Sequence, residues 1–543
     1  MPGFNLIDNE WIPCLMNGEV KKLGLLETLR DAHEIKWIYD PSPVITASLH
    51  RLLLAILHRN FGPADSEGWK RLWEQGRWNE EKLTDYFARW ARRFNLLDEN
   101  YPFYQCASLP FSYELPIAKL FHELASGNNA TLFDHTIETS PDAIFPDEAA
   151  RVLIACQAFS VGGLITYEKG QDRKSFGSAN NAPLVKGGVV LATGNNLFQT
   201  LMLNLHRYSG YHGEPFTFDE KEDLAAWERD EEIRAEERHL RGYIDLLTWQ
   251  SRRIKLRPEQ SSNGKVLIRY AVIMKGNQFS DRYSLHDKET MLAFIKREKP
   301  ASGQDPWPTI SFREDRALWR DSLALFQSVE NQRSKPKTMN WLSDLVLDGV
   351  IPSSRTYNLS VMGLTTNRAN IILWRHERLP LPLKYLHDEY LLASLKDALD
   401  IAEKAGKQLR WSSWYLSKLL IAGDVQNVSK QQKLEISDFQ HHLSIDIPYW
   451  SQLGIIFPDL LTRLAEDVTR DGEDTFYGSE TIPWWAAEVR RAALAAFDEA
   501  VSGLDRSARM LKAMTLANAL FRKRLNNILA QAQEPYQILA ERR

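Results

Sequence analysis

The chain has 543 residues, of which 44% are hydrophobic and 25% charged, a composition typical of a globular protein with two or more domains. Its formal net charge of −4 excludes a uniformly basic nucleic-acid-binding protein, so any such binding must use a local patch. The three cysteines, Cys14, Cys106 and Cys156, are widely spaced and predict neither a zinc site nor a disulfide framework.

The N-terminal part of the chain predicts short strands mixed with helices. The alternation in residues 4–23 predicts a hairpin that turns at Asn17-Gly18. Residues 42–61 predict a long amphipathic helix with leucines on one face. Shorter helices are predicted at 25–32 and 80–94.

A polar loop is predicted from Ser126 to Thr139, where the helical pattern lapses. Asn128 and Asn129 make its first part polar, and the apolar pair Leu132 and Phe133 lies inside it. Loops of this length within compact domains are often functional. We therefore treat this loop as a candidate site.

A glycine pair, Gly162 and Gly163, follows a helix predicted over 146–159. Two glycines after a helix can simply end it. They can also allow the backbone to come very close to a partner, because they have no Cβ atom. Local pattern alone favours the first interpretation.

The middle of the chain carries several basic stretches. Residues 167–189 predict a mobile loop rich in glycine and lysine, whose spacing matches no phosphate-binding P-loop. Residues 218–241 are charged with mixed sign, which predicts an exposed segment, and 266–274 predict a strand. Residues 300–320 predict a loop that contains Arg313 and Arg316.

A second hairpin is predicted between residues 357 and 381. Two apolar runs, 359–364 and 371–374, are joined by a polar connection with the single cation Arg368. We expect Pro380 and Pro382 to stop the second strand. The tip is either an ordinary solvated turn, which local pattern favours, or a rigid probe for an anionic or stacked partner.

Beyond residue 382 the sequence is helical to its end. Helical periodicity is predicted in 385–404, 409–421, 439–469, 483–504 and 508–533, with Pro448 and Pro458 breaking the third stretch into shorter pieces. Such a pattern is typical of an antiparallel bundle of about four main helices. The chain therefore divides near residue 380.

The motifs of common enzymes are missing. The sequence has no nucleophile elbow, Walker motif, HExxH or Rossmann fingerprint, and we expect no catalytic residue, metal or cofactor. No leader or run long enough to span a bilayer is found, so we expect a cytoplasmic protein with no membrane partner. A nucleic-acid-cleaving enzyme and a pure assembly scaffold remain the alternative functions.

Several stretches, in the same order along the chain, resemble the CasA family, the large subunit of the type I-E CRISPR complex Cascade. They are FNLIDNEWIP, SLHRLLLAILHR, YPFYQ, LTWQSRRIKL and NRANIILWRHERL. The resemblance covers the whole chain. It implies an α+β fold, with a large mixed α/β N-terminal domain over 1–380 and an all-α C-terminal four-helix bundle over 381–543.

The resemblance also implies a function without catalysis. Members of the family recognise the protospacer-adjacent motif (PAM) of foreign double-stranded DNA through the minor groove, and they wedge the duplex open to start an R-loop. The implied partners are the other Cascade subunits, the CRISPR guide RNA, the double-stranded target DNA and a helicase-nuclease, in antiviral defence.

Three reading elements of the family are carried onto this chain by resemblance. The glycine loop of the family corresponds to Ser160–Gly163 in this sequence, and the wedge of the family corresponds to Thr366–Asn370. Arginine at the wedge tip departs from the glutamine of some relatives. Arg313 and Arg316 are the first candidates for its basic finger, and Lys275 is the next. The implied DNA- and PAM-binding residues are Gly162, Gly163, Arg313, Arg316, Asn367, Arg368 and Ala369.

Two further surfaces follow from the resemblance. The loop with Asn128, Asn129, Leu132 and Phe133 resembles the loop that contacts neighbouring subunits and the 5′ end of the guide RNA. The basic faces of the helical bundle either track duplex phosphates or form a solvated face. These faces include Arg506, Arg509, Lys512, Arg522, Lys523 and Arg524.

Overall fold

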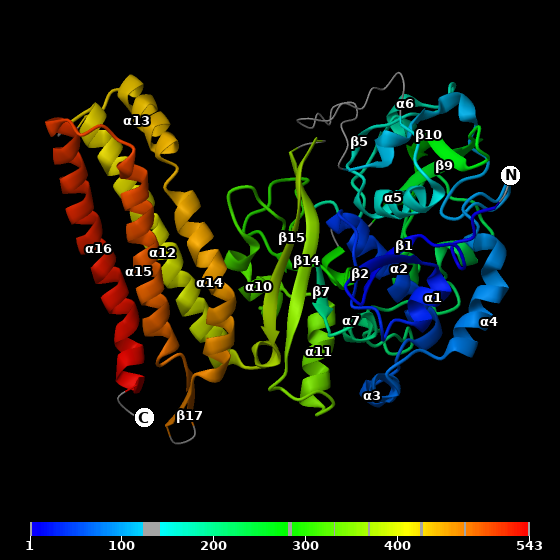
Figure 1. Cartoon of the computed structure of the whole chain (residues 1–543), viewed down its shortest axis with the longest axis horizontal. Helices are drawn as coiled ribbons and strands as arrows, with labels where there is room; N and C mark the ends of the chain where they lie inside the picture. Colours follow the sequence, from blue (N-terminus) through cyan, green and yellow to red (C-terminus); the bar gives the residue numbers. More distant parts are fainter. Residues whose placement is uncertain are drawn as a thin grey trace. The chain divides into compact units, whose positions relative to one another are not determined.

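The computed structural model describes residues 3–122, 142–280, 285–330, 332–367, 370–423, 427–471 and 474–540. They belong to two units, which are described separately below (Figure 1). The first unit comprises Met1–Leu318 and Gln327–Leu379, and the second comprises Trp319–Phe326 and Pro380–Arg543. The structure thus mixes helices and strands, as the sequence predicts.

The first unit begins with the predicted hairpin. Strands β1 (Ile12–Met16) and β2 (Glu19–Leu23) pair in antiparallel fashion, and β3 (Trp37–Ile38) extends the sheet. Asn17 and Gly18 have φ angles of 50° and 85°, the positive values that a tight two-residue turn requires. The predicted turn at Asn17-Gly18 is therefore confirmed.

The core of the first unit surrounds α2 (Pro43–Phe61). The sequence predicts one apolar face, but nearly the whole helix is buried, including its polar residues. It packs against α5 (Pro146–Phe159), α7 (Leu197–Asn204) and α8 (Tyr243–Leu247). Arg51 on this helix is tolerated in the core because it forms a buried ion pair with Glu289, with an N–O distance of 2.8 Å.

Two further sheets support the candidate site. Strands β9 (Arg252–Gln260) and β10 (Val266–Lys275) form an antiparallel pair that β4 (Leu115–Pro116) extends. The third sheet has the order β15-β14-β7, with β7 (Val189–Thr193) antiparallel to β14 (Thr356–Asn367). Strand β15 (Asn370–Pro382) lies at its edge, and Figure 1 shows β14 and β15 as a long hairpin.

The remaining elements of the first unit are short or peripheral. The helices are α1 (Leu25–Arg30), α3 (Ser66–Gln75), α4 (Glu80–Trp90), α6 (Arg173–Phe176), α9 (Leu285–Lys288) and α11 (Lys337–Leu347). The strands are β5 (Gly163–Leu164), β6 (Ser178–Ala179), β8 (Glu237–Arg238), β11 (Gln278–Phe279), β12 (Phe294–Ile295) and β13 (Arg333–Ser334).

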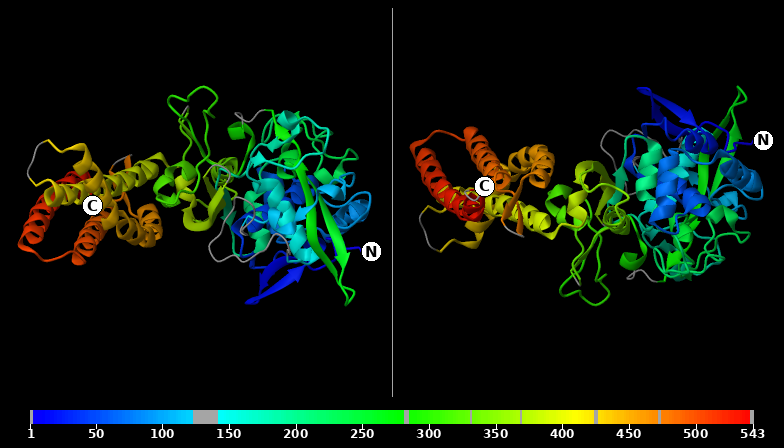
Figure 2. Two further views of the ribbon diagram at one scale, coloured as in Figure 1. Left: turned by 90° about the horizontal axis from the view of Figure 1, so that it is seen from above. Right: turned by 90° about the horizontal axis from the view of Figure 1, so that it is seen from below.

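Long helices dominate the second unit. Helix α12 packs against α13, α14, α15 and α16, and α15 and α16 run side by side in the views of Figures 1 and 2. A short hairpin, β16 and β17, connects α14 to α15. The bounds are α12 (Glu389–Ile421), α13 (Lys430–Leu443), α14 (Asp446–Glu466), β16 (Val468–Asp471), β17 (Asp474–Tyr477), α15 (Thr481–Ser502) and α16 (Ala508–Ala540).

Two predicted breaks in this unit are wrong. Residues 385–404 and 409–421 contribute to one continuous helix, α12. Helix α14 also continues through Pro458, and Pro448 lies in its first turn, where the missing N–H has no helical partner to lose.

The second unit also includes a segment that the sequence places in the first. Residues 319–326 precede residue 380 by a wide margin, but they pack among the long helices. Trp319 contacts the rings of Trp450 and Phe457, with centroid distances of 5.9 and 4.7 Å. This correction to the predicted division at 380 follows from aromatic packing, which local pattern does not reveal.

Candidate functional site

The hairpin β14–β15 is longer than the sequence predicts. Its strands continue to Asn367 and from Asn370, and Arg368 and Ala369 between them lie outside the described residues. The second strand passes Pro380 and ends at Pro382, so Pro380 does not stop it. Because β15 is an edge strand, a proline on its open side costs no hydrogen bond.

The segment with Arg313 and Arg316 lies against this hairpin. The Thr365 hydroxyl donates to the carbonyl of Phe312 at 2.8 Å. Arg313 is exposed and pairs with the exposed Asp315 at 3.0 Å, whereas Arg316 is half-buried. The structure therefore brings both predicted basic residues beside the hairpin.

The glycine pair follows α5 as predicted, but it does not end the helix in the usual way. The residue after the helix, Ser160, has φ −60° and ψ 126°, so no left-handed glycine cap is formed. A Cβ atom on Gly162 would lie 2.8 Å from the backbone nitrogen of Asn181. Gly162 is thus required by the close approach of its own chain.

Gly163 has a different environment. It is exposed and pairs with Ala179 in the ladder of β5 and β6. Its φ of 153° lies in a region that residues with a side chain rarely adopt. The next residue, Leu164, is 85% exposed, which leaves the backbone at this point open to a partner.

Arg252 lies beneath this loop and was not singled out from the sequence. Its side chain is buried, and its guanidinium donates to the carbonyls of Val161 and Asn180 at 3.0 Å each. Burial lowers the pKa of Arg252 to about 10, so the group stays charged near neutral pH. The alternation of β9 is the signal that could have found it, because Arg252, Ile254 and Leu256 share the buried face.

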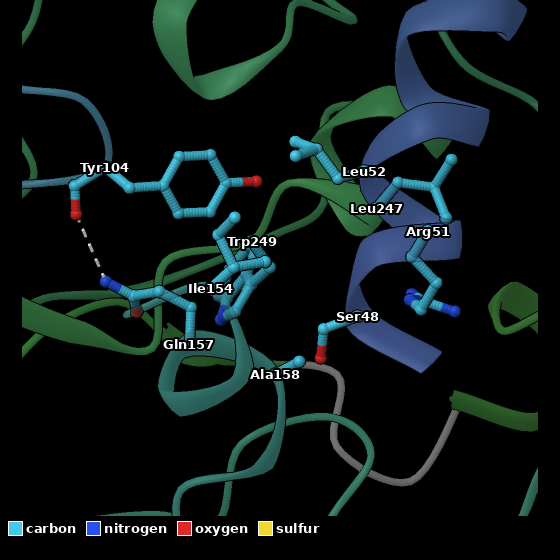
Figure 3. Close-up of a pocket in the computed structure, with 9 residues that line it drawn as sticks. All are labelled: Ser48, Arg51, Leu52, Tyr104, Ile154, Gln157, Ala158, Leu247 and Trp249. Carbon is cyan, nitrogen blue, oxygen red and sulfur yellow. Dashed lines mark hydrogen bonds between the residues drawn. The ribbon is translucent and has the colours of Figure 1, made fainter. Parts of the chain in front are cut away.

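Gln157 ties the end of α5 to the start of β9. Its side-chain nitrogen donates to the carbonyl of Arg252 at 2.8 Å, and its side-chain oxygen accepts from the Arg252 N–H at 2.9 Å. Gln157 also lines a cavity of about 20 Å³ together with residues of α2 and α5 (Figure 3). This volume holds about one water molecule, so the cavity is too small for a cofactor.

Lys275, the further candidate for the basic finger, lies at the end of β10. Its ammonium donates to the carbonyl of Ser175 at 2.7 Å, in the segment between Leu164 and β6. Met274 forms a bridge to Thr166 in the same segment. Lys275 therefore lies on the side of the glycine loop, whereas Arg313 lies beside the hairpin.

The predicted elements are connected by a hydrogen-bonded path through residues 182–188. The N–H of Ala182 donates to the carbonyl of Ser160 at 2.8 Å. Further along the path, the N–H of Gly188 donates to Ile310 at 3.1 Å, and the Thr309 hydroxyl donates to Lys186. This path joins the glycine loop to the Arg313 segment and, through Phe312, to β14.

Some predicted residues cannot be placed. Asn128, Asn129, Leu132 and Phe133 lie outside the described residues, like Arg368 and Ala369. Asn367 is placed only through its backbone at the end of β14.

Several basic residues of α16 already have partners within the second unit. Arg522 donates to Asn518 at 2.8 Å, and the Arg524 guanidinium lies 3.7 Å from the ring centroid of Trp411. Arg509 donates to the carbonyl of Leu420. Arg506, Lys512 and Lys523 are exposed. A phosphate-tracking role for this face stays a prediction.

Among the described residues, no group of three or more His, Cys, Asp or Glu residues is arranged to hold a metal ion. Burial raises the pKa of the Cys106 thiol to about 11 and that of Cys14 to about 12, which disfavours the nucleophilic thiolate. None of the described helices is both long and apolar enough to cross a bilayer.

Comparison with known proteins gives one consistent result. The family model of CRISPR-associated protein Cse1 matches residues 5–496. CasA/Cse1 of Thermus thermophilus is 31% identical over 545 residues, covering 97% of this chain and 98% of the relative.

Solved structures agree with this match. A crystal structure of Thermus thermophilus CasA has a TM-score of 0.78 and 28% identity, covering 97% of this chain and 100% of the other. A chain of a CRISPR RNA-guided surveillance complex has a TM-score of 0.70 over 96% of this chain and 100% of its own. Its identity of 19% makes this a likeness of fold alone.

Proposed function

This chain belongs to the family of CRISPR-associated protein Cse1, also named CasA, the large subunit of the type I-E complex Cascade. From that membership we propose that it acts without catalysis as the large subunit of an RNA-guided surveillance complex in the cytoplasm. Its partners are the other Cascade subunits and the CRISPR guide RNA, and its role is antiviral defence. The fold likeness to a chain of such a complex supports this proposal.

The proposed reading surface combines the glycine loop, the Arg313 segment and the hairpin. The observation that carries it is the path of hydrogen bonds from Ser160 through Lys186 and Phe312 to Thr365, because it fixes these elements to one another. The exposed Gly163 backbone approaches the PAM in the minor groove of the target DNA. That groove presents a degenerate pattern of acceptors, so recognition there is permissive.

Strand separation is assigned to the tip of the hairpin. Arg368 acts as the wedge beside the first target base pair, with Asn367 and Ala369 facing the PAM. The long paired strands β14 and β15 support this role, because a wedge must resist bending when it meets the duplex. Guide pairing then supplies most of the sequence specificity, a division of labour that is also known for another class of CRISPR effector.

The remaining surfaces are assigned to assembly. The loop with Asn128, Asn129, Leu132 and Phe133 contacts neighbouring subunits and the 5′ end of the guide RNA. After R-loop formation, the protein helps to recruit the helicase-nuclease. The domain layout is a mixed α/β domain over 1–380, from which residues 319–326 depart, and a four-helix bundle over 381–543. Its members are the four longest helices of the unit, α12, α14, α15 and α16, and α12 packs against each of the other three.

The test of the reading role is the substitution Gly163→Asp in the reconstituted complex. The carboxylate would face DNA phosphate, and the side chain would not tolerate the backbone conformation of this position. We expect at least a tenfold loss of affinity for a PAM-containing duplex, about 1.4 kcal/mol, in a gel-shift assay. Assembly of the complex is expected to continue.

The matched control is Gly170→Asp. Gly170 is exposed, has a φ of 96° and would have nothing within 4 Å of an added Cβ atom. The Gly170→Asp variant therefore introduces the same charge and a comparable backbone strain. Gly170 lies outside the proposed reading surface. The affinity of the Gly170→Asp complex for the duplex is therefore expected to stay within twofold of that of the unsubstituted complex. Equal losses in both variants, or no loss in Gly163→Asp, would remove the glycine loop from the proposed function.

A further inference from the structure

Arg252 is a buried cation that is held by carbonyl groups instead of a carboxylate. Its exposed fraction is 3%, and no ion pair with it is found among the described residues. One guanidinium nitrogen donates to Val161 and Asn180 at 3.0 Å and to Ser160 at 3.4 Å. The other donates to the carbonyl of Ser251 at 2.9 Å. Burying a charge in this way is costly, and the contacts that compensate for it are concentrated on the glycine loop.

The contacts of Arg252 determine which way the loop's peptide groups face. In a trans peptide the C=O of one residue and the N–H of the next point in opposite directions. Because the carbonyls of Ser160 and Asn180 point toward Arg252, the N–H groups of Val161 and Asn181 point away from it. Neither N–H donates to another group in the described part of the chain.

Other contacts hold the same loop from its own residues and from its surroundings. The Ala182 N–H donates to Ser160, and the Gly162 N–H donates to the Asn181 side chain at 2.7 Å. The Asn180 N–H also donates to the Gln278 side chain at 2.5 Å, and the Ser160 N–H donates to the carbonyl of Cys156 on α5 at 3.1 Å. Arg252 differs from these contacts because its one guanidinium holds carbonyls on both sides of the loop and joins them to β9.

We propose that Arg252 is a positioning residue for PAM reading: it turns the carbonyls of Ser160, Val161 and Asn180 inward and presents the N–H groups of Val161 and Asn181 to acceptors on the DNA. This inference rests on the proposed function of the glycine loop and adds the group that sets its conformation. A planar guanidinium can reach several carbonyls at once, whereas a lysine ammonium in its place has a different geometry and a stronger need for hydration.

The test uses Arg252→Lys and Arg252→Gln in the complete complex with guide RNA. Binding is measured on a fully paired PAM-containing duplex and on the same sequence with a pre-opened bubble beside the PAM. We expect both variants to bind the paired duplex at least tenfold more weakly and the bubble within threefold of the unsubstituted protein. Discrimination between PAM and non-PAM duplexes is expected to fall by a similar factor.

Amide hydrogen exchange of the full chain gives a readout that is independent of DNA. Exchange in peptides covering Ser160–Gly163 and Asn180–Ala182 is expected to become faster in both variants, while β14 stays unchanged. Arg151→Lys is the control, because Arg151 is a similarly buried arginine on α5 that donates to the carbonyl of Trp11 and does not touch the loop.

The outcomes separate this inference from the proposed function. Equal losses on the paired and bubble targets, or failure of both variants to assemble, would give Arg252 a purely structural role and overturn the inference. Normal binding despite faster exchange in the loop would also overturn it. If the Gly163→Asp complex binds the PAM-containing duplex normally in the same assay, the proposed function itself fails. If Gly163→Asp weakens binding but the two Arg252 variants do not, only the role of Arg252 is contradicted.

Discussion

The hydroxyl of Thr365 on β14 donates to the carbonyl of Phe312 at 2.8 Å, so the hairpin and the residue preceding Arg313 are fixed to each other. The ring of Phe312 also lies close to the hairpin, 3.2 Å from the point that a Cβ atom on Gly363 of β14 would occupy. A cation on this segment is therefore held beside the strand that leads to the proposed wedge. Two predictions concern this arrangement.

Arg313→Ala should weaken binding of target duplex by the complex and make that binding less dependent on salt. Arg313 is exposed, so its guanidinium is available to a phosphate despite the nearby Asp315. Loss of one phosphate contact should reduce the slope of log affinity against log salt by about 1. Titrations between roughly 50 and 200 mM salt measure this slope.

Asp315→Asn is the matched control for Arg313. It removes the acidic partner of the same ion pair but leaves the cation in place. Affinity should stay the same or rise, because repulsion between Asp315 and phosphate is lost. Equal weakening in both variants would show that the ion pair shapes the loop instead of binding DNA.

Arg368→Ala should slow R-loop formation on fully paired targets and have little effect on targets with a bubble next to the PAM. The proposed wedge assists the opening of the first base steps, which costs on the order of 1–2 kcal/mol per step, and a bubble supplies that opening in advance. Stopped-flow measurement of R-loop formation on the two targets tests this difference.

Arg378→Ala is the control for the hairpin tip. Arg378 lies on β15 away from the tip, 5.5 Å from the ring centroid of Trp37. The Arg378→Ala variant should leave the rate of R-loop formation unchanged on both targets.

If Arg368→Ala slows R-loop formation on both targets, Arg368 contributes a general attraction to phosphate. If it slows the reaction on neither target, the tip is an ordinary solvated turn.

Arg320→Ala should destabilise the helical unit. The Arg320 guanidinium pairs with Glu403 at 2.8 Å and lies 3.5 Å from the ring centroid of Trp450. Its side chain is only 7% exposed, so removal breaks the ion pair with Glu403 and the contact with Trp450, at a cost of about 2–4 kcal/mol. Urea unfolding followed by tryptophan fluorescence measures the change.

Lys396→Ala in the same unit is the comparison for Arg320. Lys396 forms an exposed ion pair with Asp400 at 3.4 Å on α12. Exposed pairs of this kind contribute about 0.5 kcal/mol or less. Similar losses in the two variants would mean that the segment 319–326 is held by its aromatic residues and not by Arg320.

The first unit should lose stability as the pH falls from about 6.5 toward 4. The rings of His58 and His206 lie 4.7 Å apart between centroids and are buried. Burial lowers the pKa of His206 to about 4 and that of His58 well below its usual range. Below about pH 6.5 the unfolded chain binds protons that the folded unit does not, so the free energy of unfolding decreases.

His206→Gln should make this pH dependence shallower. Each buried neutral histidine contributes a slope of up to about 1.4 kcal/mol per pH unit in that window. Urea midpoints at several pH values between about 5 and 7.5 provide the measurement. His212→Gln, at an exposed position, is the control and should leave the slope as it is. An unchanged slope in His206→Gln would assign the acid sensitivity to other groups.

Residue order alone predicts the features that depend on local periodicity and turn chemistry. The Asn17-Gly18 hairpin, the strands on either side of residues 368–369 and the helical second part are visible in it, because each arises from interactions between near neighbours. The resemblance of several ordered stretches also identified the family that the comparisons confirm.

How distant residues combine depends on packing in three dimensions. Arg252 appears in the sequence as one basic residue beside an apolar run, and nothing in residue order places it under Ser160 and Asn180. Likewise, Pro458 predicts a break, but packing of α14 against α12 and α15 keeps the helix continuous. Residues 319–326 join the helical unit, where Trp319 packs on Phe457 and Arg320 packs on Trp450, contacts that local pattern does not show. These outcomes depend on burial and on contacts across many residues, whose free energies exceed local preferences of about 1 kcal/mol.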